Sequence, residues 1–345
     1  MHPKRHVENL LDGNDDSFFQ FGPALSDNNG SLYSLQHSHF LDLGIGDEST
    51  FPATVSDLHD SHLISKHHMA EFTDIGLNAK SSGAKPGGGT GGGGTGGVLT
   101  TYTSGSSLVD DHNEFNINIV FSGTWTAKQQ AVVTWAADLL SSIIYGDVRD
   151  DTDLSGRFVD DVVINVSTGR IDGSGNPLTG NILAQTQITA VRDAGTIQEW
   201  LPVTSTMTLD STDLKSSTWS ATWDDIVLHE MTHALGFAGV IFDGLKLLGA
   251  SGNFIGTNAM LAYGGAVPVE KSGGTGTAGS HWNETAFAPQ GQHMSNELMT
   301  GYVAANEKTY LSDTTVGALA DLGYVVHDPS LAANYYIVDS GLLVV

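Results

Sequence analysis

Cysteine is absent from the 345 residues of this chain, and basic side chains are scarce, with 14 against 39 acidic ones. Without cysteine there is no disulfide bond, no thiolate metal ligand and no cysteine nucleophile, so any catalytic chemistry must use other groups. The formal net charge of -25 opposes binding to nucleic acid and to anionic membrane surfaces. The composition therefore predicts partners other than polyanions.

Long apolar runs are also missing. No stretch approaches the roughly 18 residues of a membrane-spanning helix, and the opening MHPKRHVENLLDGNDD lacks the apolar segment of a cleavable signal peptide. We expect an extracellular location reached without a conventional signal peptide, while a cytoplasmic location stays open. The apolar ending NYYIVDSGLLVV suits either a C-terminal export signal or a last β-strand.

Composition divides the chain into three parts. Residues 1–82 are polar and carry eight of the 14 histidines. We expect a poorly packed leader or pro-segment, and the alternative is that these histidines form a metal site of their own. Residues 83–97 are mostly glycine and predict a flexible linker. Residues 98–345 are the expected folded domain, with a catalytic core at about 113–327.

The first part of this domain has the patterns of strands and of one helix. At 115–121 apolar residues recur at every second position, which predicts a half-buried strand. Thr126 begins a capping-box spacing, and apolar residues then repeat on one helical face up to Gly146. Further strands are expected at 160–167 and 201–210.

Two more helices are expected further along the chain. One runs from about Thr222 to Leu235, followed by Gly236, which suits a left-handed stop. Ser312 can cap a short helix that ends at Gly323 and leads into an apolar strand or tail. This order of elements predicts an α+β fold, with a mixed sheet over the helix at 222–235.

That helix carries the stretch LHEMTHALGFAG, residues 228–239. Residues four apart lie above one another on a helix, so the imidazoles of His229 and His233 can hold one zinc ion, and Glu230 lies between them as a general base. Zinc in such sites takes a third protein ligand and lowers the pKa of a bound water towards about 7. The alternative is an amphipathic core helix whose histidines are only hydrogen-bonded.

The third ligand is not within the stretch itself. The spacing HEMTHALG resembles that of metzincin zinc peptidases, whose compact motif supplies the third ligand at the position of Gly239, and glycine has no side chain to donate. Downstream, the histidines before the final tail are His281 and His293. A carboxylate, Glu284 or Glu297, is a further alternative that would imply a different class of zinc peptidase.

The segment SHWNETAFAPQGQHMSNELMTGYV resembles the leishmanolysin family of metzincin peptidases, in which histidine followed by tryptophan precedes a Glu-Leu-Met turn. HALGF and the late third histidine resemble the same family, and looser likeness covers about two thirds of the chain. The resemblance implies a metzincin-like fold whose C-terminal subdomain carries the third ligand and the methionine turn. It also implies zinc ligands His229, His233 and His281, Glu230 as general base, a turn at Gly236, and Met299 beneath the metal.

Two residues near the turn leave alternatives open. The interval between His281 and Met299 contains an insertion relative to the family pattern, and this insertion brings in His293 as the rival third ligand. Tyr302 follows Met299 at a spacing that differs from metzincins in which a tyrosine approaches the metal, so we interpret it as structural.

These patterns together predict a zinc-dependent endopeptidase that acts on a protein or peptide substrate. One alternative is a non-enzymatic secreted or adhesion protein with a vestigial metal site. Such a protein could lose Glu230 and still bind metal, so the presence of Glu230 argues against this alternative. The other is a zinc hydrolase of a non-peptide bond. The sequence does not define an oligomeric state, a cleavage preference or an activation step.

Overall fold

A computed structural model describes residues 17–20, 98–106, 109–171, 182–272, 276–289, 293–303 and 308–327, which all belong to one compact unit. The linker predicted at 83–97 and the leader predicted at 1–82, except residues 17–20, lie outside these ranges. The tail from residue 328 onwards also lies outside them, and so does the strand or export signal expected there.

A six-stranded mixed sheet forms the centre of the fold, in the order β1-β7-β8-β6-β3-β2. Strands β3, β6 and β8 run parallel, whereas β2 pairs antiparallel with β3, β7 with β8, and β1 with β7. The strands are β1 Ser17–Gln20, β2 Thr101–Thr103, β3 Ile117–Ser122, β6 Val162–Gly169, β7 Ile182–Val191 and β8 Pro202–Asp210. Strands β4 Asp151–Thr152 and β5 Phe158–Val159 form a separate small hairpin.

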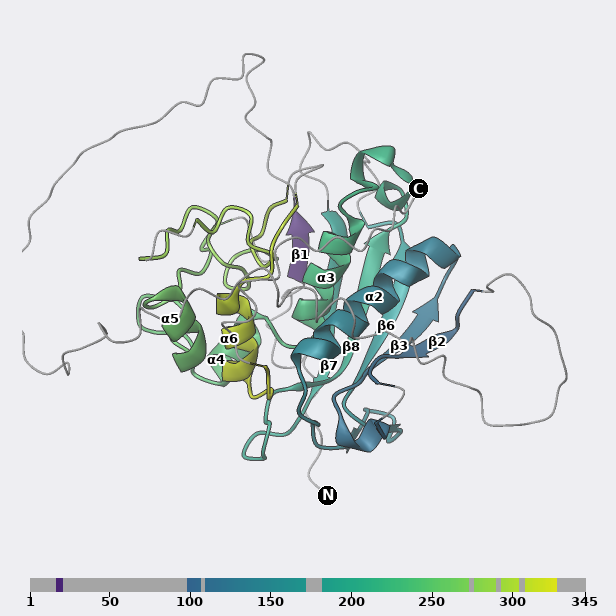
Figure 1. Ribbon diagram of the computed structural model, residues 1–345, viewed down its shortest axis with the longest axis horizontal. Helices are drawn as coiled ribbons and strands as arrows, with labels where there is room; N and C mark the ends of the chain where they lie inside the picture. The colour runs from purple at the N-terminus through teal and green to yellow at the C-terminus, as the bar shows by residue number, and fades with distance from the viewer. Residues whose placement is uncertain are drawn as a thin grey trace, which may run out of the picture. The chain divides into compact units, whose positions relative to one another are not determined.

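Helices α2 Ala127–Ile143 and α3 Trp223–Ala234 pack against each other and against this sheet, on the face seen in Figure 1. The capping box predicted at Thr126 is present in both directions with Gln129, although α2 ends at Ile143 and not near Gly146. The alternation predicted at 115–121 is confirmed, because its apolar members are buried. The expectation of an α+β fold with a mixed sheet is therefore correct.

The described residues after α3 form three short helices and connecting loops. These helices are α4 Gly239–Gly244, α5 Thr257–Tyr263 and α6 Asp313–Leu322. Short 3-10 turns lie earlier in the chain, before α3, at Asp111–Asn113, Asp213–Lys215 and Ser217–Trp219. Ser312 caps α6 and Gly323 ends it, as the sequence predicts. Helices α4 and α5 were not predicted, because glycine-rich flanking segments hide helices of only six and seven residues.

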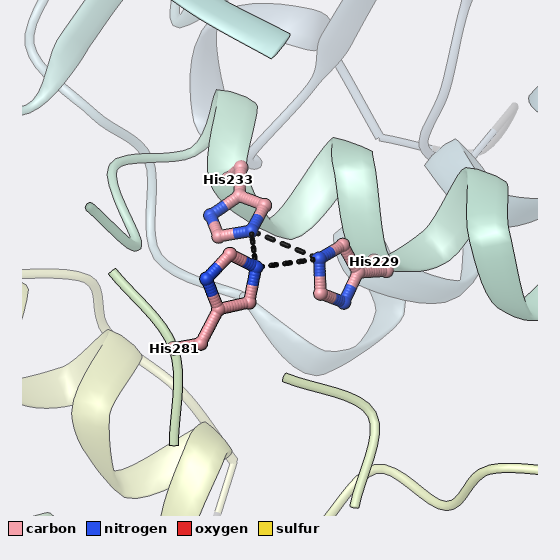
Figure 2. A group of neighbouring side chains, drawn as sticks. All are labelled: His229, His233 and His281. Atoms are coloured by element: carbon pink, nitrogen blue, oxygen red, sulfur yellow. Dashed lines mark hydrogen bonds between the residues drawn. The ribbon is translucent and has the colours of Figure 1, made fainter. Parts of the chain in front are cut away.

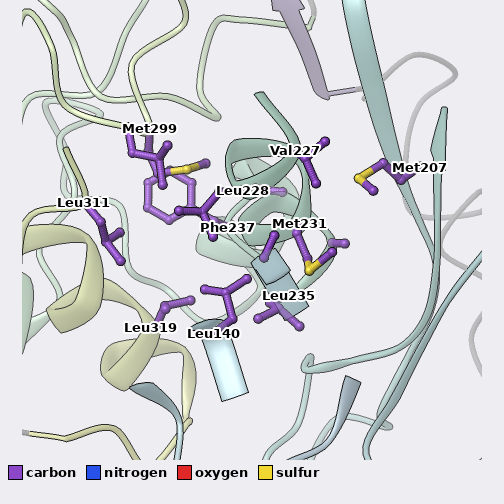
Figure 3. Packing of buried hydrophobic residues seen from close by; sticks show 14 of the residues in the cluster. Leu140, Met207, Val227, Leu228, Met231, Leu235, Phe237, Met299, Leu311 and Leu319 are labelled. Carbon is purple, nitrogen blue, oxygen red and sulfur yellow. The ribbon is translucent and has the colours of Figure 1, made fainter. Parts of the chain in front are cut away.

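One apolar core joins the sheet to this C-terminal segment. Figure 3 shows a cluster that contains Leu140 of α2, Met231 of α3 and Met207 of β8. The same cluster contains Leu319 of α6 and Met299, which lies on a loop before α6. Each of these five side chains is at most 1% exposed. The core therefore holds the loop that carries Met299 against the helix that carries His229 and His233.

Candidate metal centre

Helix α3 brings His229 and His233 to the same side, and both side chains are fully buried. The helix ends where Gly236 adopts φ 103°, a left-handed conformation that side chains disfavour. The turn brings the carbonyl of Phe237 back to the Nδ1 of His233 at 2.5 Å. The end of α3 thus fixes the orientation of one of its own histidines.

Gly239, the first residue of α4, is the point at which the chain after α3 meets the segment of His281. A Cβ atom at Gly239 would lie 2.8 Å from the backbone oxygen of Gly279, which is closer than real Cβ contacts allow. The Gly239 N–H donates to the Ser280 hydroxyl at 3.0 Å. The glycine that cannot supply a ligand is therefore required for the close packing of the segment that ends in His281.

Three histidines converge on one point, as Figure 2 shows. The Nε2 atoms of His229 and His233 lie 2.9 Å apart, and that of His281 lies 3.2 Å from His229 and 3.1 Å from His233. All three side chains are buried. Among the described residues, no carboxylate joins this group.

The other ring nitrogen of each histidine contacts a backbone carbonyl. The Nδ1 of His229 lies 2.6 Å from the oxygen of Leu298, and that of His281 lies 3.0 Å from the oxygen of Thr277. A carbonyl only accepts, so Nδ1 carries the proton in each neutral ring and Nε2 presents a lone pair. Three lone pairs that face one another cannot satisfy each other, and a cation is the group that fits between them.

Burial keeps these rings neutral. It lowers the pKa values of His229 and His233 well below their usual range, and neighbouring histidines lower them further. Burial also lowers the pKa of His281 to about 4. Neutral imidazole is the form that binds a metal, so the site is prepared for an ion at physiological pH.

Trp282 and Met299 hold the third histidine in place. The indole of Trp282 packs against the rings of Phe237 and Phe254, and its backbone N–H donates to the Met299 carbonyl at 2.9 Å. Met299 is fully buried in the core of Figure 3. The tryptophan that follows His281 is thus an anchor for its backbone.

The alternative ligands lie elsewhere. His293 is exposed and contacts Phe287 across a short antiparallel bridge. Glu297 is fully buried but accepts hydrogen bonds from Ser312 and Thr315. Glu284 is half-buried, and so is Tyr302, where burial and nearby carboxylates raise the pKa. Neither His293 nor either of these two glutamates belongs to the three-histidine group.

Sequence reasoning missed the backbone acceptors that orient the rings. The carbonyls of Phe237, Thr277 and Leu298 have no side-chain signal, so only the folded chain identifies them.

A second group, His112 with Asp150 and Asp160, also has ligand atoms close together. It is largely exposed, and His112 is already paired with Asp160 at 2.9 Å.

Comparison with known proteins adds no assignment, since no protein-family model and no curated protein matches the chain. Across the described residues, every helix is too short or too polar to cross a bilayer. The fold and site define an α+β protein with a buried three-histidine group that could bind a metal ion. The likeness to leishmanolysin stays a prediction from the motifs.

Proposed function

We propose that the protein is a zinc-dependent endopeptidase with a metzincin catalytic fold of the leishmanolysin type. The observation that carries the proposal is the convergence of three neutral Nε2 atoms, from His229, His233 and His281, beside the helix that bears Glu230. Three nitrogen ligands leave one position of a tetrahedral ion open, which is the arrangement of catalytic zinc rather than structural zinc.

The donor set favours zinc and other transition metals over magnesium and calcium. Imidazole suits zinc, copper, iron and nickel, whereas magnesium and calcium require oxygen ligands that this group does not offer. When bound, zinc acts as a Lewis acid and lowers the pKa of a bound water to about 7. The three carbonyl partners hold the imidazoles in the tautomer that binds through Nε2.

Glu230 supplies the proton transfer in this proposal. It follows His229 on α3, and the hydroxyl of Thr186 on β7 donates to its backbone carbonyl at 3.0 Å, which ties this turn of the helix to the sheet. The Glu230 carboxylate accepts a proton from the attacking water and passes it to the departing amine. A retained glutamate between two ligands favours a hydrolase over a vestigial metal site.

The test is digestion of an unfolded protein by the full chain, with and without a chelator, and by Glu230→Gln. We expect chelation to abolish cleavage and Glu230→Gln to lower kcat about 1000-fold, because general-base catalysis supplies about that factor. Glu230→Gln should retain zinc at the wild-type stoichiometry, which separates loss of the base from loss of the metal.

The outcomes also separate the alternatives. Zinc binding without cleavage of any unfolded protein would favour a non-enzymatic protein. Hydrolysis of ester substrates alone, still dependent on Glu230, would favour a zinc hydrolase of a non-peptide bond. Cleavage that survives both the chelator and Glu230→Gln contradicts the mechanism.

A further inference from the structure

Glu297 joins two segments that are separate in the sequence. Its carboxylate accepts from the Met299 N–H at 2.5 Å on one side. On the other side it accepts from the hydroxyls of Ser312 at 2.7 Å and Thr315 at 2.5 Å, and from the Ser312 N–H at 3.2 Å. A fully buried carboxylate is costly to desolvate, and these donors at the start of α6 offset that cost.

The peptide that Glu297 holds is the one that orients His229. Leu298 lies between Glu297 and Met299, and its carbonyl accepts the Nδ1–H of His229 at 2.6 Å. The Leu298 N–H donates to the carbonyl of Tyr310 at 2.8 Å. With Glu297 fixing the next N–H, this carbonyl has little freedom to turn away from the imidazole.

Thr315 extends the same connection towards the third histidine. Its hydroxyl donates to Glu297 and accepts from the indole N–H of Trp282 at 2.9 Å. Trp282 directly follows His281 in the chain. The first turn of α6 therefore reaches two of the three histidines, one through Glu297 and one through Trp282.

We propose that Glu297 is a positioning residue for the metal site, which fixes the Leu298 carbonyl against His229 and connects both to α6. This inference rests on the metal site of the proposed function and on no property of peptide cleavage. Glu297 does not bind the ion. It acts through the orientation of a ligand, in the way that outer hydrogen-bond partners tune metal affinity.

The experiment measures the zinc dissociation constant of the full chain by competition with a chromophoric chelator, together with urea unfolding of each zinc-free variant. Glu297→Gln keeps the shape but places an amide NH₂ towards at least one backbone N–H. Asp161→Asn is the matched control: Asp161 is similarly buried and accepts from the N–H groups of Asn116 and Val148, both at 2.7 Å, and these partners lie outside the three-histidine group.

We expect Glu297→Gln to raise the zinc dissociation constant about tenfold or more, since outer hydrogen-bond partners contribute about 10- to 100-fold. Asp161→Asn should lower stability but leave zinc affinity within about twofold of wild type. Equal zinc affinities for the wild type and Glu297→Gln, both folded, would overturn the proposal. So would an equal loss in Asp161→Asn, since the effect would then be general destabilisation.

Thr315→Val keeps the inference testable if Glu297→Gln does not fold. It removes one hydroxyl that bonds to both Glu297 and Trp282, and we expect a rise of at least about threefold in the dissociation constant from the loss of these two hydrogen bonds. Wild-type affinity in folded Thr315→Val would count against the proposal. If the wild type binds no zinc, both proposals fail; if it binds zinc but cuts no peptide, only the proposed function fails.

Discussion

The described domain has two halves that are held together by different interactions. Residues 98–235, the sheet half, contain the strands β2 to β8, whose backbones pair along several consecutive residues. Residues 236–327, the C-terminal half, contain among their described residues only isolated bridges, such as Trp282 with Thr300. Repeated backbone pairing stabilises the first half, and it is nearly absent from the second.

Single polar side chains take the place of strand pairing in the C-terminal half. Besides the contacts of Glu297, Thr309 donates its N–H and its hydroxyl to Asp225 of α3, at 3.0 and 2.6 Å, which joins the C-terminal half to the sheet half. Asp321 of α6 accepts from the N–H groups of Asn258 and Ala259 at the start of α5. Such a structure depends on few contacts. The loss of any one of them should therefore lower stability more than the loss of one hydrogen bond between paired strands does.

The largest expected effect is on the ligand that the C-terminal half contributes to the metal site. Zinc sites bind with about 10–16 kcal/mol in total, so loss of one of three histidines should cost about 4 kcal/mol, or about 1000-fold in Kd. We expect this loss in His281→Ala, measured by chelator competition. His293→Ala should bind zinc with the affinity of the wild type. Loss of zinc affinity in His293→Ala, with wild-type affinity in His281→Ala, would assign the third ligand to His293.

The pH dependence of stability should differ in sign between a buried histidine of the metal site and an exposed histidine of the zinc-free chain. Burial lowers the pKa of His281 from 6.5 to about 4. The unfolded chain binds its proton first, so stability is lost as pH falls from about 6.5 towards 4, by about 3 kcal/mol for this residue. In the sheet half, the hydrogen bond to Asp160 raises the pKa of exposed His112, whose contribution is present in acid and lost as pH rises through its folded pKa.

Urea unfolding of zinc-free variants at a series of pH values checks these signs. Relative to the wild type, His281→Gln should reduce the loss of stability in acid, and His112→Gln should slightly increase it. A steeper acid loss in His281→Gln would show that His281 is not held neutral in the folded chain.

Chelation should loosen the two halves unequally. Free zinc at about 100 times its Kd stabilises the folded state by about 2.7 kcal/mol, and its removal should speed amide exchange about 100-fold where opening breaks the site. We expect this at Leu298 and Trp282, whose N–H groups bond within the C-terminal half. The exchange rates of the amides in β6 and β8 should change little. An equal increase in both halves would show that the two halves open as one cooperative unit.

The same difference explains what the sequence could predict. Apolar residues at every second position predicted β3 and a repeat on one helical face predicted α2, because each of these elements buries an apolar face with its own period. Strands β6 and β8 and helix α3 were also expected, at 160–167, 201–210 and 222–235. The capped helix at Ser312 was also predictable, since its signals are local. Helices α4 and α5 were not, because tertiary contacts rather than patterns define them.

For the site, spacing on one helix predicts that His229 and His233 lie together, but nothing local relates them to His281. The motif resemblance suggested that residue, and the packing of Gly239 against Gly279 gives the physical reason the two segments meet. Residue type marks Glu297 only as a possible ligand. Its contacts with Met299, Ser312 and Thr315 depend on folding, so residue type alone could not distinguish these roles.

The two helix caps give the smallest and most direct comparison. Thr126 caps α2 and Ser312 caps α6, each by accepting a backbone N–H three residues later. Thr126→Ala should cost about 1 kcal/mol, the usual loss for an N-cap. Ser312→Ala should cost about 2 kcal/mol, because its hydroxyl also donates to Glu297 at 2.7 Å, and this bond adds about 1 kcal/mol.

Urea unfolding and zinc competition on both cap variants complete this test. We expect Thr126→Ala to leave zinc affinity unchanged and Ser312→Ala to weaken it about threefold, since one of the hydrogen bonds that hold Glu297 is lost. If both variants lose the same stability and neither alters zinc binding, the α6 cap is an ordinary one. The C-terminal half would then depend on its polar contacts for folding alone, and not for the geometry of the three histidines.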